Sequence, residues 1–143
     1  MGVPINMFDP NKVTIKHGKG YSFFGIGPNV PHVKGNTIYF PRGYVADFST
    51  GSFGDQHLFV HELTHVYQHQ VLNVNLFSAK IKAGNSKNSY IYNLKTQEFS
   101  SMNIEQQAEA VADAWAVRSG YNISQYPGVG TLDEYKSVVP FFK

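Results

Sequence analysis

Apolar residues recur at helical spacing in two segments of this chain. In the first, from Ser52 to about Val71, they fall on one side of a helical projection: Phe59, Val60, Leu63, Val66, Tyr67 and Val71. In the second, from Asn103 to about Ser119, they form one stripe: Ile104, Ala108, Val111, Ala112 and Trp115. We therefore predict two long amphipathic helices.

Capping residues mark where both helices begin. Ser52 is followed three residues later by Asp55, and Asn103 is followed three residues later by Gln106. Pairs at this spacing can exchange hydrogen bonds between side chain and backbone at a helix N-terminus. Gly120 follows the second segment and is typical of a helix end.

The clearest strand signal is Asn36–Phe40, where β-branched and aromatic residues precede Pro41. As an edge strand beside the first helix, it could pair with an extended substrate backbone. As a strand of a small sheet, it would only cover that helix. Further extended pieces are predicted at Lys12–His17 and Tyr21–Ile26, with glycines as turns between them.

The rest of the chain is expected to be loops and one short helix. Residues 73–102 are predicted to be a long connection in which Tyr90–Tyr92 is extended. A turn-rich stretch with Pro127 and Gly128 precedes a short helix at Thr131–Ser137. The fold class is therefore α+β, with a small mixed or antiparallel sheet packed on the two motif helices in a single domain spanning residues 1–143.

Composition excludes several classes of partner and ligand. Twelve Lys and Arg against ten Asp and Glu give a formal net charge of +2, and no basic run suggests a nucleic-acid partner. No apolar run approaches the length of a membrane span, so we expect no membrane partner. No signal peptide is visible, so we expect a cytoplasmic location or export by a dedicated secretion system. There is no cysteine, so any metal site must use His, Asp or Glu.

The first helix contains His61-Glu62-Leu63-Thr64-His65, the H-E-x-x-H pattern of zinc hydrolases. Histidines four residues apart lie one turn above each other on a helix, so both can bind one zinc ion. Glu62 lies close enough to take a proton from zinc-bound water, which makes it the predicted general base. A surface helix that merely carries polar residues fits this spacing poorly.

A catalytic zinc site needs a third protein ligand. His69 is eight residues from His61, about 12 Å along a helix axis, which is too far to share one ion. The same argument limits His57, so we expect both histidines at the rim of the site. The second helix offers Glu105 at the edge of its apolar stripe and Glu109 one turn further on. Carboxylates that border a packing face are costly unless paired or metal-bound. We favour Glu105 because it lies closer to the stripe in the helical projection.

The two helices resemble those of the gluzincin metallopeptidases, in which a glutamate from a later helix completes H-E-x-x-H. Glu105-Gln-Gln-Ala-Glu109 looks like the E-x-x-A-D pattern of the small membrane-protease gluzincins, with Glu109 in place of the aspartate. The resemblance implies Glu105 as the third zinc ligand and Glu109 as a residue that hydrogen-bonds a zinc histidine. A rival alignment, from Glu109 to Asp113, makes Glu109 the ligand.

His61–Gln68, H-E-L-T-H-V-Y-Q, also resembles the compact metallopeptidase domains associated with bacterial secretion and toxin systems. The resemblance covers the two helices only. The small membrane proteases carry transmembrane helices that this chain lacks, so their membrane substrates do not carry over. What the resemblance implies is a zinc metallopeptidase that hydrolyses peptide bonds in a peptide or protein substrate, as a bacterial effector or toxin-associated domain.

A donor for the tetrahedral oxyanion is also expected. The candidates are Tyr67, Tyr90, Tyr92 and His32, although His32 is otherwise expected, like His17, to be a loop or surface histidine. Two other functions stay open. One is an amidase acting on cell-wall peptides, and the other is a zinc-binding interaction module without catalysis. Retention of Glu62 argues against the second, because a structural zinc site needs no base.

Overall fold

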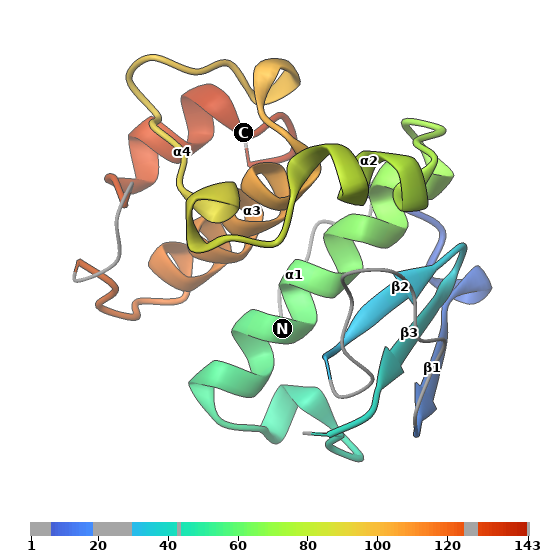
Figure 1. Cartoon of the computed structure of the whole chain (residues 1–143). Coiled ribbons are helices and arrows are strands. Elements are labelled where there is room, and N and C mark those ends of the chain that lie inside the picture. The colour runs from blue at the N-terminus through green and yellow to red at the C-terminus, as the bar shows by residue number, and fades with distance from the viewer. Residues whose placement is uncertain (1–6, 19–29, 43, 125–128, 143) are drawn as a thin grey trace.

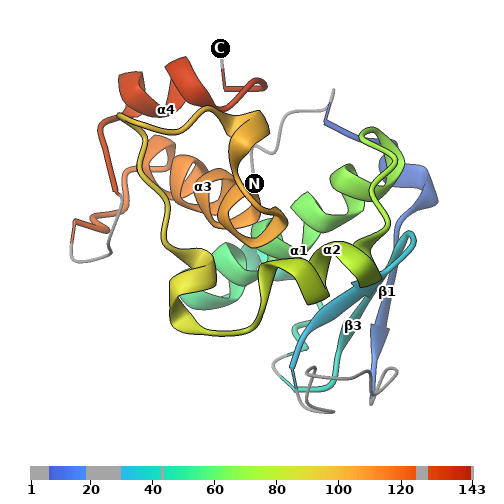
Figure 2. The same cartoon turned by 45° about the horizontal axis from the view of Figure 1, so that its top comes forward.

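The computed structural model describes residues 7–18, 30–42, 44–124 and 129–142. Helix α1 (Phe53–Gln70) crosses the middle of the molecule. A small sheet packs on one side of α1, while α3 (Ile104–Arg118) and α4 (Leu132–Val138) lie on the other (Figure 1). The rotated view shows the same arrangement (Figure 2). The predicted α+β class is confirmed.

The sheet has three strands in the order β1-β3-β2. Strand β1 (Thr14–His17) runs parallel to β3 (Thr37–Phe40), and β2 (His32–Lys34) runs antiparallel to it, so the sheet is mixed. A two-residue turn joins β2 to β3, and its first residue, Gly35, has a φ of +59°. That left-handed conformation favours glycine, because a Cβ atom would clash with the backbone.

Two apolar cores meet on α1. Leu63 and Val66 pack with the sheet, in a cluster that includes Ile38 and Phe40. The other core lies on the α3 side and contains Val60 and Tyr67 of α1 with these residues of α3: Ala110, Val111, Ala112, Ala114, Trp115 and Ala116. The apolar side predicted for the first helix is therefore divided between two partners. Its last member, Val71, is 54% exposed.

Both motif helices begin where their capping residues predicted. Ser52 and Asp55 form a capping box at the start of α1, and Asn103 and Gln106 form one at the start of α3. The apolar stripe predicted for α3 is buried along its whole length. The short helix near the C-terminus is confirmed as α4, capped by Thr131. The predicted extended piece at 21–26 and the turn at 127–128 lie outside the described residues.

The structure decides or corrects three local expectations. Of the two roles considered for Asn36–Phe40, it has the second: β3 is the central strand of a small sheet that packs on α1, so it has no free edge for a substrate. The strand at the edge nearest α1 and α2 is β2. β2 was not predicted, and it carries His32, which is buried rather than at the surface. Tyr90 ends a 3-10 helix, Lys87–Tyr90, and so is not extended as predicted, whereas Ile91 has the predicted extended backbone. The side chains of Asn103 and Gln106 donate to the backbone carbonyls of residues 89 and 91, which gives this segment hydrogen bonds without a sheet.

The predicted long connection also contains a helix, α2 (Leu76–Ala83), which contacts α1, α3 and β2. Asn75 caps its start, and Gly84, with a φ of +78°, ends it. Other short 3-10 helices lie at Pro10–Lys12, Phe48–Thr50 and Phe99–Ser101. Within the described ranges, no helix is both long and apolar enough to cross a membrane.

The alanines of α3 generate a prediction about packing. Ala112 is fully buried in the core between α1 and α3. Ala112→Leu would force extra methyl groups into that close contact, which typically costs about 1–3 kcal/mol. We expect urea denaturation to show a loss of unfolding free energy in this range. An unchanged midpoint would show that the two helices are not closely packed at this position.

Candidate metal centre

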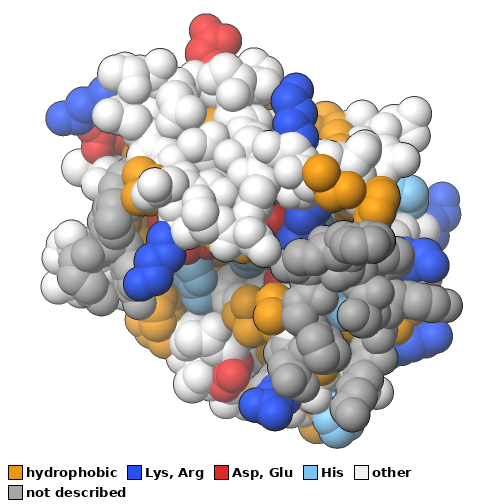
Figure 3. Space-filling view, in the orientation of Figure 1, with side chains coloured by type: hydrophobic (Ala, Val, Ile, Leu, Met, Phe, Trp, Pro, Cys, Tyr) orange, Lys and Arg blue, Asp and Glu red, His pale blue; other side chains and the backbone are white. Residues whose placement is uncertain are grey.

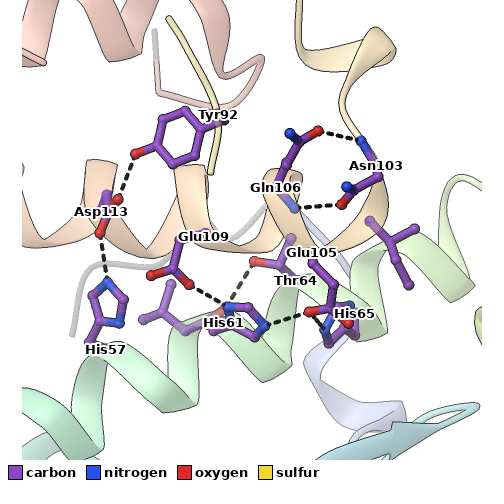
Figure 4. A network of polar contacts seen from close by, with 12 residues as sticks. His57, His61, Thr64, His65, Tyr92, Asn103, Glu105, Gln106, Glu109 and Asp113 are labelled. Atoms are coloured by element: carbon purple, nitrogen blue, oxygen red, sulfur yellow. Dashed lines mark hydrogen bonds and ion pairs between the residues drawn. The ribbon is translucent and has the colours of Figure 1, made fainter. Parts of the chain in front are cut away.

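Three predicted ligands converge between α1 and α3. His61 and His65 project from consecutive turns of α1, and Glu105 lies in the first turn of α3. Their ligand atoms all lie within 4.8 Å of one another. Glu105 Oε2 is 3.1 Å from His61 Nε2 and 3.4 Å from His65 Nε2 (Figure 4). We call His61, His65 and Glu105 the ligand cluster.

The donor atoms of the ligand cluster fit a metal ion. Two imidazole nitrogens and one carboxylate oxygen are the protein ligands of many catalytic zinc sites. His65 Nε2 is buried and has no hydrogen-bond partner, although buried polar atoms nearly always have one. A cation at the centre of the cluster would satisfy this nitrogen and share the carboxylate oxygen that both histidines face.

Each histidine of the cluster is oriented through its other ring nitrogen. His61 Nδ1 donates to Glu109 Oε2 at 3.0 Å, and His65 Nδ1 donates to Gln68 Oε1 at 2.8 Å. The amide nitrogen of Gln68 donates in turn to the carbonyl of Ile104 and to Gln107 Oε1. Such contacts fix the orientation and tautomer of a metal-binding imidazole.

This geometry favours Glu105 over Glu109 as the third ligand. Glu105 Oε2 lies on the Nε2 side of His61, where His65 Nε2 is also near. Glu109 lies at Nδ1, on a different edge of the same ring. One ion cannot be bound from both edges of an imidazole, so Glu109 fits the orienting role that the resemblance implies. Its side chain is also 28% exposed, against 1% for Glu105.

The two carboxylates set the charge of His61. Burial alone would lower its pKa, but the hydrogen bonds to Glu105 and Glu109 outweigh burial and raise the pKa to about 10. Burial raises the pKa of Glu105, but the hydrogen bond from His61, the nearby imidazole of His65 and the charge of Lys80 outweigh burial, so the net pKa is lowered. The pKa of Glu109 is lowered in the same way, mainly by His61. Without metal, His61 is therefore an imidazolium between two carboxylates.

Glu62, the predicted general base, is buried on the same stretch of α1. It is 3% exposed, and its Oε2 atom has no hydrogen-bond partner. An unsatisfied carboxylate oxygen of this kind is costly in a purely structural role. It is available to accept a proton from a water molecule in the site.

His57 and His69 do not belong to the ligand cluster, as their spacing predicted. His57 Nε2 donates to Asp113 Oδ1 at 2.8 Å, and Tyr92 donates to the other oxygen of Asp113 at 2.6 Å. His57, Asp113 and Glu109 form a second group whose possible ligand atoms lie within 4.8 Å of one another. Both oxygens of Asp113 in this group already accept hydrogen bonds. His69 lies near Gly35 at the wall of a neighbouring cavity.

Of the four predicted oxyanion donors, Tyr90 is the best placed. Its ring centroid is 6.0 Å from that of His61. Burial and the charges of Glu105, Glu62 and Glu109 raise its pKa to about 12, so it keeps its proton at neutral pH. Tyr92 is occupied by Asp113 and Tyr135.

The other two donor candidates have no described hydrogen bond or ring contact with the ligand cluster. Tyr67 packs against Phe141 in the core on the α3 side. His32 Nδ1 donates to the carbonyl of Val30, while its Nε2 atom is buried without a partner.

The site adjoins a cavity of about 780 Å³. β2 with its turn forms one part of the cavity wall and α2 another, and His65 also borders it. In the space-filling view, drawn in the orientation of Figure 1, histidine and acidic side chains are visible in a hollow of the surface (Figure 3). The ligand cluster therefore lies next to a space large enough for part of a peptide.

Sequence reasoning left two residues of the site without a role. Gln68 lies three residues after His65, a spacing that places both on one helix face and that could have identified it. Lys80 lies 3.2 Å from Glu105 Oε1. No spacing pointed to it, because it comes from α2, 25 residues before Glu105 and on a helix that was not predicted.

Comparison with protein-family models found no match, and comparison with curated proteins found none either. Among solved structures, the chain is similar to the effector domain of Pseudomonas aeruginosa VgrG2b, with a TM-score of 0.60 and 24% sequence identity. The alignment covers 96% of this chain and 79% of that chain. At this identity, the likeness establishes a shared fold.

The charge of His61 predicts how the stability of the metal-free protein depends on pH. Its folded-state pKa of about 10 lies above the ordinary value of 6.5. The stabilisation that protonated His61 contributes is therefore fully present below pH 6.5 and is lost as the pH rises through about 10. Between these values, we expect the unfolding free energy of metal-free wild type to fall more than that of His61→Gln, as measured by urea denaturation. The other titrating groups are present in both proteins, so their contributions cancel in the comparison. Parallel pH profiles would therefore contradict the raised pKa of His61.

Proposed function

We propose that this chain is a zinc-dependent metallopeptidase in which the ligand cluster holds the metal and Glu62 is the general base. The observation that supports it best is the convergence of two imidazoles and one carboxylate, together with a second, unsatisfied carboxylate on Glu62 whose charge acts on His61. A structural zinc site is normally closed by four protein ligands and has no use for a base. The sequence supplies three ligands and Glu62, which is the composition of a catalytic site.

Each residue of the site has a defined task in amide hydrolysis. Zinc, when bound, would activate a water molecule and polarise the carbonyl of the scissile amide. Glu62 accepts the proton of the attacking water and passes it to the leaving nitrogen. Tyr90 donates a hydrogen bond to the developing oxyanion, because its raised pKa keeps it protonated. Glu109 and Gln68 keep the two imidazoles in place.

We also propose that the chain acts as a bacterial effector domain. The support is its fold, which is similar to that of an effector domain over nearly the whole chain. Production of wild type in a bacterial host, with and without an export signal, tests this role. Growth inhibition that requires Glu62 is expected in one compartment. Unimpaired growth in both would contradict an effector role against bacterial cells and leave the peptidase proposal to the assays below.

The ligand assignment predicts an order of metal affinities. Glu105→Gln removes a ligand and should weaken zinc binding far more than Glu109→Gln. The second change removes an orienting contact and should cost about 10–100-fold. Competition with a chelator measures both, and a His61→Ala/His65→Ala double variant gives the level without binding. If Glu109→Gln has the larger effect, the rival alignment is correct.

Glu62 provides the test of catalysis. Glu62→Gln keeps the shape of the side chain but removes the base, so zinc content should stay normal while hydrolysis falls by about 10²–10⁴-fold. Glu98→Gln is the matched control, because it removes an exposed carboxylate elsewhere. The assay uses a mixed peptide library and, in parallel, purified cell-wall peptides. A Glu62→Gln protein as active as wild type would rule out the mechanism. Turnover of cell-wall peptides alone would instead indicate an amidase.

A further inference from the structure

We propose that Lys80 is a positioning residue that holds the carboxylate of Glu105 so that only one of its oxygens faces the metal. The inference rests on the proposed function, since it concerns the geometry of a metal ligand. It assigns a role in the metal centre to α2, a helix that lies between the two motif helices in the chain.

The two oxygens of Glu105 have different surroundings. Oε2 faces both imidazoles of the ligand cluster. Oε1 is buried and accepts no hydrogen bond of good geometry from the described residues. Within the described part of the chain, its polar neighbour is the ammonium group of Lys80, at 3.2 Å. The Glu105 side chain is only 1% exposed, so this ammonium group takes the place that water would otherwise fill.

The position of Lys80 is unusual for a residue of α2. No residue of this helix is fully buried, and Phe77 and Ile81 are 49% and 58% exposed. The Lys80 side chain is only 21% exposed, because it reaches from the helix toward Glu105. A lysine can do this at low cost by packing its apolar stem along the protein while its charged end meets a buried carboxylate. α2 thus directs a single cation at one ligand of the cluster.

Lys80 completes a pattern in which each residue of the ligand cluster has one orienting partner. Glu109 holds His61 and Gln68 holds His65, each by a hydrogen bond at Nδ1. Glu105 is held at the oxygen that points away from the histidines. A carboxylate whose two oxygens are both free can bind a metal through either or both. With Oε1 engaged by Lys80, Glu105 binds through Oε2 alone, which leaves the remaining coordination position to water or substrate.

The experiment compares three variants of the full chain. Lys80→Met removes the charge and keeps most of the apolar stem, while Lys80→Arg keeps a cation that can donate to a carboxylate. Lys82→Met is the matched control, since Lys82 is an exposed lysine of the same helix. Zinc affinity is measured by chelator competition, and the visible absorption spectrum of the Co²⁺-loaded protein reports the coordination geometry. The thermal stability of each metal-free variant is measured separately.

We expect Lys80→Met to weaken zinc binding by about 10–100-fold and to alter the Co²⁺ spectrum. Lys80→Arg should keep most of the zinc affinity and most of the wild-type Co²⁺ spectrum. Lys82→Met should match wild type in both measurements. If Lys80→Met lowers only the thermal stability, Lys80 only holds α2 in place in the fold, and the proposal is wrong. If affinity and spectrum are unchanged while KM rises, Lys80 binds substrate instead, and the proposal is equally wrong. A wild-type protein that binds no metal would contradict the proposed function itself, which separates the two failures.

Discussion

The structure depends on the burial of carboxylates from α3 against imidazoles from α1. A carboxylate removed from water is stable only when charges or hydrogen bonds compensate it. Here His61 lies between Glu105 and Glu109, and each carboxylate lies about 3 Å from one of its ring nitrogens. The small side chains of α3 allow this approach, because they let the two helices pack closely. The same contacts therefore hold the helices together and shape the candidate metal centre.

The residues around the ligand cluster come from several elements. Glu109 lies on α3, Gln68 on α1 and Lys80 on α2, and each contacts a different member of the cluster. Gln68 is itself held by α3 through the carbonyl of Ile104. Support from three helices would hold the ligands and the base of the proposed peptidase in one geometry, as catalysis requires. Because α2 and β2 also border the neighbouring cavity, the elements next to the metal centre also line the space available to a substrate.

The fold and the function of this chain rest on different kinds of support. The fold is shared with the effector domain of Pseudomonas aeruginosa VgrG2b at 24% identity. A shared fold hosts many activities, so the function has to be argued from the site itself. The argument is the chemistry of two imidazoles, a buried carboxylate beside them and an unsatisfied Glu62. These side chains would support amide hydrolysis in any scaffold that held them in this arrangement.

The sequence by itself determined the two motif helices, the strand Thr37–Phe40, the two histidines of the ligand cluster and the pair of glutamates that could complete it, because helical spacing, capping and strand-forming residues are local properties of a chain. The mixed sheet, with its central and edge strands, was decided by tertiary structure, since strand pairing joins distant residues. The choice of Glu105 over Glu109 also needed the fold, because both carboxylates lie on one helix and only the crossing with α1 decides which ring nitrogen each meets. The role of Lys80 could not be predicted from the sequence for the same reason. This lysine acts on a residue 25 positions away, from a short helix that was not predicted, so no local spacing in the sequence connects the two residues.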